Sequence, residues 1–251
     1  MMNAWDLYEE RLNGKGGTMR GAVLRREKRV LSTKLPKGLS YHNVTLNGKN
    51  QSIEIIDTDN FNIKLIYSMP NEDIPHGSLI EWFDNYWLTV EKDANSELRA
   101  KAKMKQCNYL LKWINADGEI CEQQCIVEDG TKYMVGEAEG KDNIMARGDT
   151  RIAVTLPKND KTVKLGRNMR FLIDDPESDV QMAYVLTKPI KVGQVYNDSG
   201  VFVFILQETQ TTDNDNKELG IADYYKHFDK NGDIKEDVDY DSDDTGKKVW
   251  F

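Results

Sequence analysis

Apolar and polar residues alternate along much of the chain in short runs that are separated by turn-forming residues. The runs 78–83 and 86–91 flank Asp84-Asn85, and the runs 107–114 and 120–128 flank a turn that contains Asp117-Gly118. Asp, Asn and Gly tolerate the positive φ that tight hairpin turns demand. The pattern therefore predicts two consecutive β-hairpins between residues 77 and 129.

The same pattern occurs on both sides of these hairpins. Asn47-Gly48 separates two apolar runs as a hairpin turn would, and residues 61–67 alternate as in a strand with one buried face. Further apolar runs are separated by turn signals: 151–156, 162–165, 169–173, 180–187 and 201–206. Short strands at this spacing are typical of a sandwich or barrel, so we expect a mainly β protein with one or two small β-barrel or sandwich modules.

Residues 99–113 are ambiguous, because their composition favours a helix whereas their spacing favours a strand. A strand would place four basic side chains on one face: Arg99, Lys101, Lys103 and Lys105. After Gln106 the phase inverts, so either a bulge rotates the strand or its two halves pack against different bodies. A helix over residues 95–106 followed by a strand fits equally well.

The chain begins with a short amphipathic helix over residues 3–12, which is expected to end at Asn13-Gly14. A basic segment follows, in which Glu27 is the one acid among these cations: Arg20, Arg25, Arg26, Lys28, Arg29 and Lys34. An extended arm with this charge favours an anionic partner. The alternative is the solvated face of a helix, since residues 20–35 can also be helical.

The composition reverses from Asp213 onward, where closely spaced acids indicate a tail that cannot bury enough apolar surface to order itself. The tail ends in Trp250-Phe251, which is either a docking peptide or a frayed terminus. We therefore divide the chain into a helix and basic arm (1–40), a first β module (41–145), a second β module (146–212) and an acidic tail (213–251).

Composition limits the classes of protein that remain. The 251 residues carry a net charge of -8, and no apolar run approaches the ~18 residues of a membrane span. The first residues lack the layout of a signal peptide. An odd set of three cysteines, Cys107, Cys121 and Cys125, argues against a disulfide framework and for folding in a reducing cytosol.

Few residues suggest catalysis or the binding of a metal or cofactor. Cys121 and Cys125 would share one strand face as small buried residues, and a zinc site would need further ligands at tighter spacing. The chain contains neither a glycine-rich phosphate loop nor a Gly-x-Ser-x-Gly elbow. We expect no enzyme, no metal and no cofactor. Aromatic residues around one turn, Trp82, Phe83, Tyr86 and Trp87, form either a stacking platform for sugars or bases or a packed core, which is the commoner role of strand aromatics.

Two segments carry a resemblance to a known family. Residues 77–93, with Gly-x-Leu-Ile-x-Trp, a turn and Trp-Leu-Thr-Val, resemble the central hairpin of small β-barrel proteins that close the head of tailed bacteriophages and join it to the tail. Lys-Met-Lys-Gln-Cys-Asn at 103–108, with Leu-Leu-Lys-Trp at 110–113, is similar to a stretch in structural proteins of phages of Gram-positive bacteria. The resemblance covers residues 44–135. Those families are usually shorter, so the second module and the acidic tail depart from their pattern.

The resemblance implies a virion structural protein without an active site, which acts in a ring as a head-closure or head–tail connector (neck) subunit. Its partners would be other copies of itself, a portal or adaptor protein, a tail protein and, without sequence specificity, packaged DNA in the channel, and not a membrane. Assembly would take place in the host cytoplasm. We expect partner contacts at Arg20, Arg25, Arg26 and Arg29, at the stripe from Arg99 to Lys105, and at Trp250 and Phe251. The alternative is a carbohydrate- or peptide-binding β module such as a tail-tip adhesin.

Overall fold

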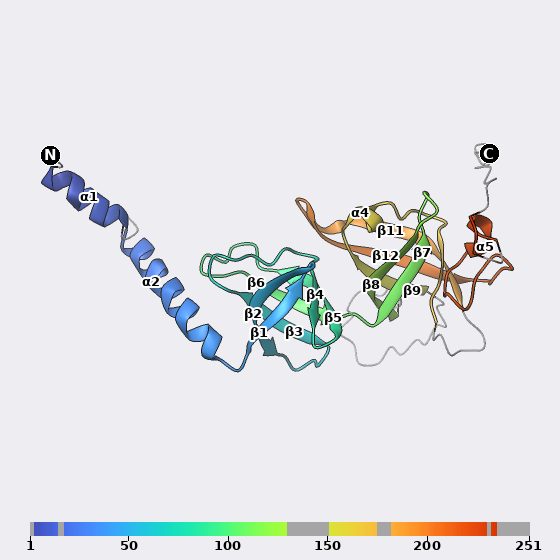
Figure 1. Cartoon of the computed structure of the whole chain (residues 1–251), viewed down its shortest axis with the longest axis horizontal. Helices are drawn as coiled ribbons and strands as arrows, with labels where there is room; N and C mark the ends of the chain where they lie inside the picture. The colour runs from blue at the N-terminus through green and yellow to red at the C-terminus, as the bar shows by residue number, and fades with distance from the viewer. Residues whose placement is uncertain (1–2, 15–17, 130–150, 175–181, 230–231, 235–251) are drawn as a thin grey trace, which may run out of the picture.

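The computed structural model describes residues 3–14, 18–129, 151–174, 182–229 and 232–234. These residues form a helical arm and two bodies of six strands each, arranged in a row with the arm at one end (Figure 1). The expected mainly β fold with barrel modules and a short N-terminal helix is confirmed.

The arm consists of α1 (Ala4–Gly14), α2 (Met19–Lys34) and a 3-10 turn, η1 (Leu35–Lys37). Thr18 caps α2, because its hydroxyl accepts a hydrogen bond from the backbone N–H of Gly21 at 3.1 Å. The basic segment is thus helical, as in the interpretation of residues 20–35 as a solvated helix, and not an extended arm. None of the residues of α2 is buried.

The first body is a closed barrel. It contains β1 (Tyr41–Leu46), β2 (Lys49–Asp57), β3 (Ile63–Ser68), β4 (Leu79–Trp82), β5 (Asn85–Lys92) and β6 (Lys101–Gln106) in the order β1-β2-β3-β6-β5-β4. Asn47 and Gly48 both have positive φ and form the predicted turn between β1 and β2. Apolar side chains from alternate strand positions fill the barrel, among them Ile53, Ile66, Ile80 and Met104.

The second body contains β7 (Tyr109–Ile114), β8 (Ile120–Asp129), β9 (Arg151–Pro157), β10 (Arg170–Leu172), β11 (Ala183–Tyr196) and β12 (Ser199–Thr209). Its order is β10-β11-β12-β9-β8-β7. The two outer strands are bridged by the Tyr109 hydroxyl, which lies 3.2 Å from the carbonyl oxygen of Leu172. Two short helices complete the body: α4 (Asp160–Val163) and α5 (Tyr224–His227).

The division between the two bodies differs from the predicted one. β7 and β8 belong to the second body, so the boundary lies between β6 and β7 and not near residue 145. The phase inversion after Gln106 marks this boundary, because β6 faces the first core and β7 faces the second. The alternative of a helix over residues 95–106 is wrong, since Lys101–Gln106 forms β6.

The turn between β4 and β5 lies one residue earlier than predicted, at Phe83 and Asp84, which have φ of 47° and 59°. Leu79 pairs with Leu88, and Glu81 pairs with Tyr86. A turn at Asp84-Asn85 would have placed Glu81 opposite Leu88, a fully buried residue. Burial of an unpaired carboxylate is costly, which favours the observed register.

The segment from Asp213 to Asp229 is ordered, contrary to the expectation of a disordered tail. Ile221, Tyr224 and Phe228 form an apolar cluster with Ile114 of β7. Of the acids that follow, Asp233 is described, whereas residues 235–251 lie outside the described residues. Residues 162–165, predicted as a strand, do not form one: Thr162 and Val163 end α4, which begins with a capping box formed by Asn159 and Thr162.

Candidate partner-binding surfaces

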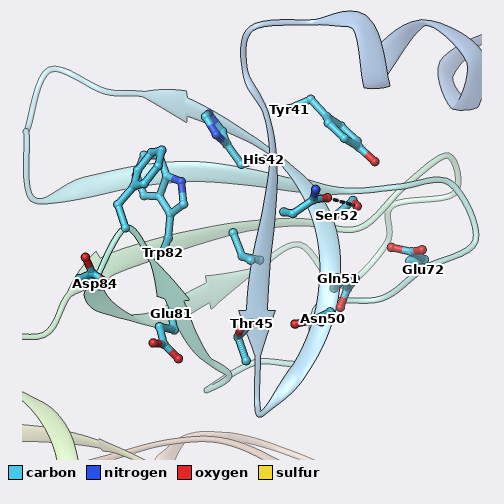
Figure 2. A pocket seen from close by; sticks show the side chains of 13 residues that line it. Tyr41, His42, Thr45, Asn50, Gln51, Ser52, Glu72, Glu81, Trp82 and Asp84 are labelled. Atoms are coloured by element: carbon cyan, nitrogen blue, oxygen red, sulfur yellow. Dashed lines mark hydrogen bonds between the residues drawn. The ribbon is translucent and has the colours of Figure 1, made fainter.

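A groove of about 840 Å³ crosses the outer face of β1 and β2 and reaches the β4–β5 turn. We call it the barrel groove. Figure 2 shows Glu81, Trp82 and Asp84 on one side of β1, whereas Gln51 and Glu72 lie on the side of β2. Polar side chains form its middle, where the Ser52 hydroxyl donates a 2.7 Å hydrogen bond to the Asn43 side chain.

Three aromatic rings meet at the end of the groove nearest the turn. The ring centroids of His42 and Trp82 are 5.1 Å apart, and those of Trp82 and Phe83 are 5.2 Å apart. Trp82 is half-buried, but Phe83 is 72% exposed. Trp87 is not part of this surface, because it is buried in the barrel core. Phe83 thus supplies the exposed aromatic face.

The turn that presents Phe83 is unusual. A bulky residue with positive φ is an outlier, since Asn, Asp and Gly are the residues favoured in such turns. Strain of this kind is concentrated at functional sites. The sequence contained one signal for this position, namely the aromatic residues around the turn, but the incorrect turn register placed Phe83 on a strand.

The groove is acidic. Glu72, Glu81 and Asp84 are exposed, and none of them has an ion-pair partner within the described part of the chain. Charges of one sign around a hollow favour ligands of the opposite sign. The rings and carboxylates together suit a cation, because a guanidinium or ammonium group is attracted to the face of an aromatic ring.

The predicted partner residues of the arm fall into two groups. Arg20 binds Glu97 at 2.7 Å, and the neighbouring Lys28 donates a 3.1 Å hydrogen bond to Asn71, so these side chains hold α2 near the first barrel. Arg25, Arg26 and Arg29 are exposed, and their guanidinium groups make no hydrogen bond or ion pair to any described residue. The second group is the one available to a partner.

The predicted stripe on β6 is matched by partners in its own chain. Arg99 pairs with Glu54 while its guanidinium lies 4.2 Å from the ring centroid of Tyr67. Lys101 lies 5.8 Å from the same ring. Lys103 binds Glu91 of the neighbouring strand β5 at 2.7 Å, and Lys105 binds Glu128 of β8, in the second body, at 2.5 Å. The stripe therefore joins strands of the same molecule, and Lys105 joins the two bodies.

The remaining predictions concern the C-terminal aromatic residues, the cysteines, metal binding and membrane spans. Trp250 and Phe251 lie outside the described residues. Cys121 and Cys125 are both buried in the second core, as expected of small apolar residues on one strand face. No group of three or more His, Cys, Asp or Glu side chains is placed to hold a metal ion in the described ranges. Among the described helices, none is long and apolar enough to span a membrane.

Comparisons with known proteins add little to this geometry. No protein-family model matches the chain, and no curated protein matches it. Solved structures of MrkH from K. pneumonia give a TM-score of 0.25 at 11% identity for the apo state, covering 74% of this chain and 84% of that one. The structure described as the MrkH-c-di-GMP complex gives a TM-score of 0.23 at 10% identity, covering 78% and 90%. Scores this low carry no argument about this chain.

Proposed function

We propose that this chain is a structural subunit without enzymatic activity, which assembles with copies of itself through its helical arm. The observation that carries the proposal is α2, a helix of 16 residues in which no side chain is buried. An isolated helix is only weakly stable in water, and most helical stability in proteins comes from packing. A helix that packs so little against its own chain gains stability when another chain covers it.

Charge supports assembly between copies. The chain has a net charge of -8, yet α2 carries six cations and one acid. An arm of one sign on a body of the other sign is attracted to the body of a neighbour. Head-to-tail contacts of this kind generate a ring if the rotation between neighbours closes.

The resemblance of residues 44–135 to head-closure and connector proteins leads us to place this ring at the head–tail junction of a tailed bacteriophage. Its neighbours there would be a portal or adaptor protein on one side and a tail protein on the other. An acidic excess would suit a channel through which DNA passes, because like charge prevents the DNA from adhering.

Sedimentation velocity and negative-stain imaging of the full chain test this function. The unmodified protein is expected to form a ring, and the charge-reversal variant Arg25→Glu/Arg26→Glu/Arg29→Glu is expected to sediment as a monomer with an unchanged far-UV circular dichroism spectrum. The matched control is Lys161→Glu/Arg167→Glu/Lys188→Glu, which reverses three exposed cations of the second body. A chain that stays monomeric at every concentration, and binds to no phage particle, would refute the proposal.

A further inference from the structure

We propose that the barrel groove of one copy receives α2 of a second copy, with an arginine guanidinium held between the aromatic rings at the β4–β5 turn and the carboxylates beside them. This inference rests on the proposed function, because it identifies the surface to which the arm binds. It concerns one occupant, a neighbouring copy of the same chain, and one chemical group, the guanidinium of the arm.

The first barrel already binds an arginine in this way. Arg99 lies over the ring of Tyr67 at 4.2 Å while it pairs with Glu54, so an aromatic face and a carboxylate hold one guanidinium between them. The groove presents the same two kinds of group to solvent, with Phe83 as the exposed ring, backed by the half-buried Trp82, and Glu81 and Asp84 as carboxylates. An aromatic face attracts guanidinium, and a carboxylate binds it with strong, charge-assisted hydrogen bonds.

Unpaired arginines of α2 and unpaired carboxylates of the groove are opposite in sign. Three arginines of α2 have no partner in the described part of their own chain, and three carboxylates of the groove likewise have none. A contact that brings the two sets together would pair charges that each copy leaves exposed to water. Complementary charge of this kind fixes the register between partners as well as the rate at which they meet.

Two of the unpaired arginines lie on one face of α2. Arg25 and Arg29 are four residues apart, so they project from one face of α2 about 6 Å apart along its axis. The groove continues from Asp84 and Glu81 across β1 and β2 to Glu72, as Figure 2 shows. α2 thus presents two guanidinium groups on one face to a groove that carries carboxylates at both of its ends.

A neighbouring copy fits better than the arm of the same copy. Within one chain, Arg20 and Lys28 fix α2 against Glu97 and Asn71. In this position Arg25 and Arg29 line a separate hollow with Asn71 and Ser32, and no residue of α2 lines the barrel groove. Six residues separate the end of α2 at Lys34 from Tyr41, which limits how far the helix can swing onto its own barrel.

Charge exchange between the two surfaces is the first test, with sedimentation velocity as the measurement. The groove variant Glu72→Lys/Glu81→Lys is expected to weaken self-association by about tenfold or more, as is the arm variant Arg25→Glu/Arg29→Glu. A chain that carries all four substitutions is expected to associate again, because the charges are exchanged. The matched control Asp213→Lys/Glu218→Lys, at two exposed acids of the second body, is expected to associate normally.

Disulfide trapping then distinguishes a second copy from the same copy. Chains with Arg29→Cys and chains with Asp84→Cys are mixed and oxidised, and a cross-linked dimer of the two is expected on a non-reducing gel. Arg29→Cys mixed with Thr187→Cys, at an exposed position of the second body, is the control that should remain uncrosslinked.

These experiments distinguish a failure of the groove contact from a failure of the proposed self-assembly. If the unmodified chain forms a ring but the groove variant forms the same ring, the inference is wrong and the arm binds elsewhere. If the unmodified chain never self-associates, both are wrong. Quenching of tryptophan fluorescence by a neutral saccharide in the unmodified chain, lost in Phe83→Asn, would assign the groove to a sugar and overturn the inference.

Discussion

Gly77 in the first body and Gly200 in the second approach so closely that a Cβ atom added to Gly77 would lie 1.9 Å from the carbonyl oxygen of Gly200. The same carbonyl accepts a 2.9 Å hydrogen bond from the backbone N–H of Lys158. Beside this contact, the rings of His76 and Tyr196 meet edge to face at 5.3 Å between centroids. The tip of the β11–β12 hairpin therefore fixes the second body against the first, and the two act as one support for the groove and the arm.

Substitution of Gly77 by alanine is expected to break this contact. The φ of Gly77 is 75°, which disfavours any side chain, and the added Cβ would also collide with backbone atoms that cannot move aside. Strain and overpacking together should lower the free energy of unfolding by about 3 kcal/mol, as measured by urea denaturation.

Gly118→Ala is the matched control for this substitution. Gly118 has a similar φ of 81°, but nothing lies within 4 Å of an added Cβ. Its cost should be about 1 kcal/mol, the cost of the backbone conformation alone. Equal losses of unfolding free energy in Gly77→Ala and Gly118→Ala would show that the contact between the bodies contributes nothing to stability.

Asp215 is expected to govern the acid stability of residues 213–229, the last described part of the second body. Its buried carboxylate binds Arg170 at 2.9 Å and accepts hydrogen bonds from the backbone N–H groups of Thr212 and Asp223. Burial acts to raise the pKa of Asp215, but the hydrogen bond from Arg170 and the two backbone N–H groups outweigh it and hold the pKa below its ordinary value. At neutral pH, Asp215→Asn should cost about 2 kcal/mol, since it removes a charged hydrogen-bond partner of Arg170, which keeps its 2.8 Å ion pair with Asp223.

The pH dependence of the stability that Asp215 contributes follows from the direction of its pKa shift. A carboxylate whose pKa is lower in the folded state contributes its full stability above the unfolded value near 3.9, and loses it as the pH falls through the lower folded value. The difference in unfolding free energy between the unmodified chain and Asp215→Asn should be constant from pH 7 to about pH 5 and should shrink below pH 4. A difference that grows on acidification would contradict this assignment.

The native cysteines are expected to react slowly, which also keeps the cross-linking experiment free of background. Burial raises the pKa of Cys107 to about 12 and raises that of Cys125 further, so very little thiolate is present at neutral pH. Labelling of the folded chain with a thiol-reactive chromophore at pH 8 should be slower than labelling in denaturant by about a hundredfold or more. Rapid labelling of Cys107 would show that the junction between the two bodies opens.

The sequence predicted the strands and turns well because local chemistry determines them. Asn47-Gly48 and the Asp117-Gly118 turn are forced by residues that tolerate positive φ, and both occur where predicted. The predicted strand at residues 61–67 is also present as β3, but its most buried residues are Ile66 and Ser68. The face that the alternation predicts as buried, with Phe61, Leu65 and Tyr67, is therefore wrong. That face is the outer one, where Arg99 covers the ring of Tyr67.

The candidate site was harder to predict because it depends on contacts between distant strands. In the sequence, Arg99 and Lys103 have no evident partners, but the folded barrel brings Arg99 to Glu54 of β2 and Lys103 to Glu91 of β5. The barrel groove combines residues from β1, β2 and the β4–β5 turn, which lie together only once the barrel closes. The free arginines of α2, by contrast, were identified from local composition alone.

Phe83 provides the sharpest test of whether the turn is shaped for binding. Phe at φ of 47° is strained, whereas Asn accepts that conformation and is the preferred residue at this position of a two-residue hairpin. Phe83→Asn should therefore raise the free energy of unfolding by about 1 kcal/mol, measured by urea denaturation. The same variant should weaken self-association in sedimentation velocity, because it removes the exposed ring.

If the turn is a binding element, Phe83→Asn must raise the free energy of unfolding and at the same time weaken self-association. Asp84→Asn serves as the matched variant, since Asn also tolerates the φ of 59° at that position while the ring of Phe83 is kept. It should leave stability within about 0.5 kcal/mol and weaken association through loss of one carboxylate. If Phe83→Asn stabilises the fold and leaves association unchanged, the strained aromatic has no part in the contact between copies.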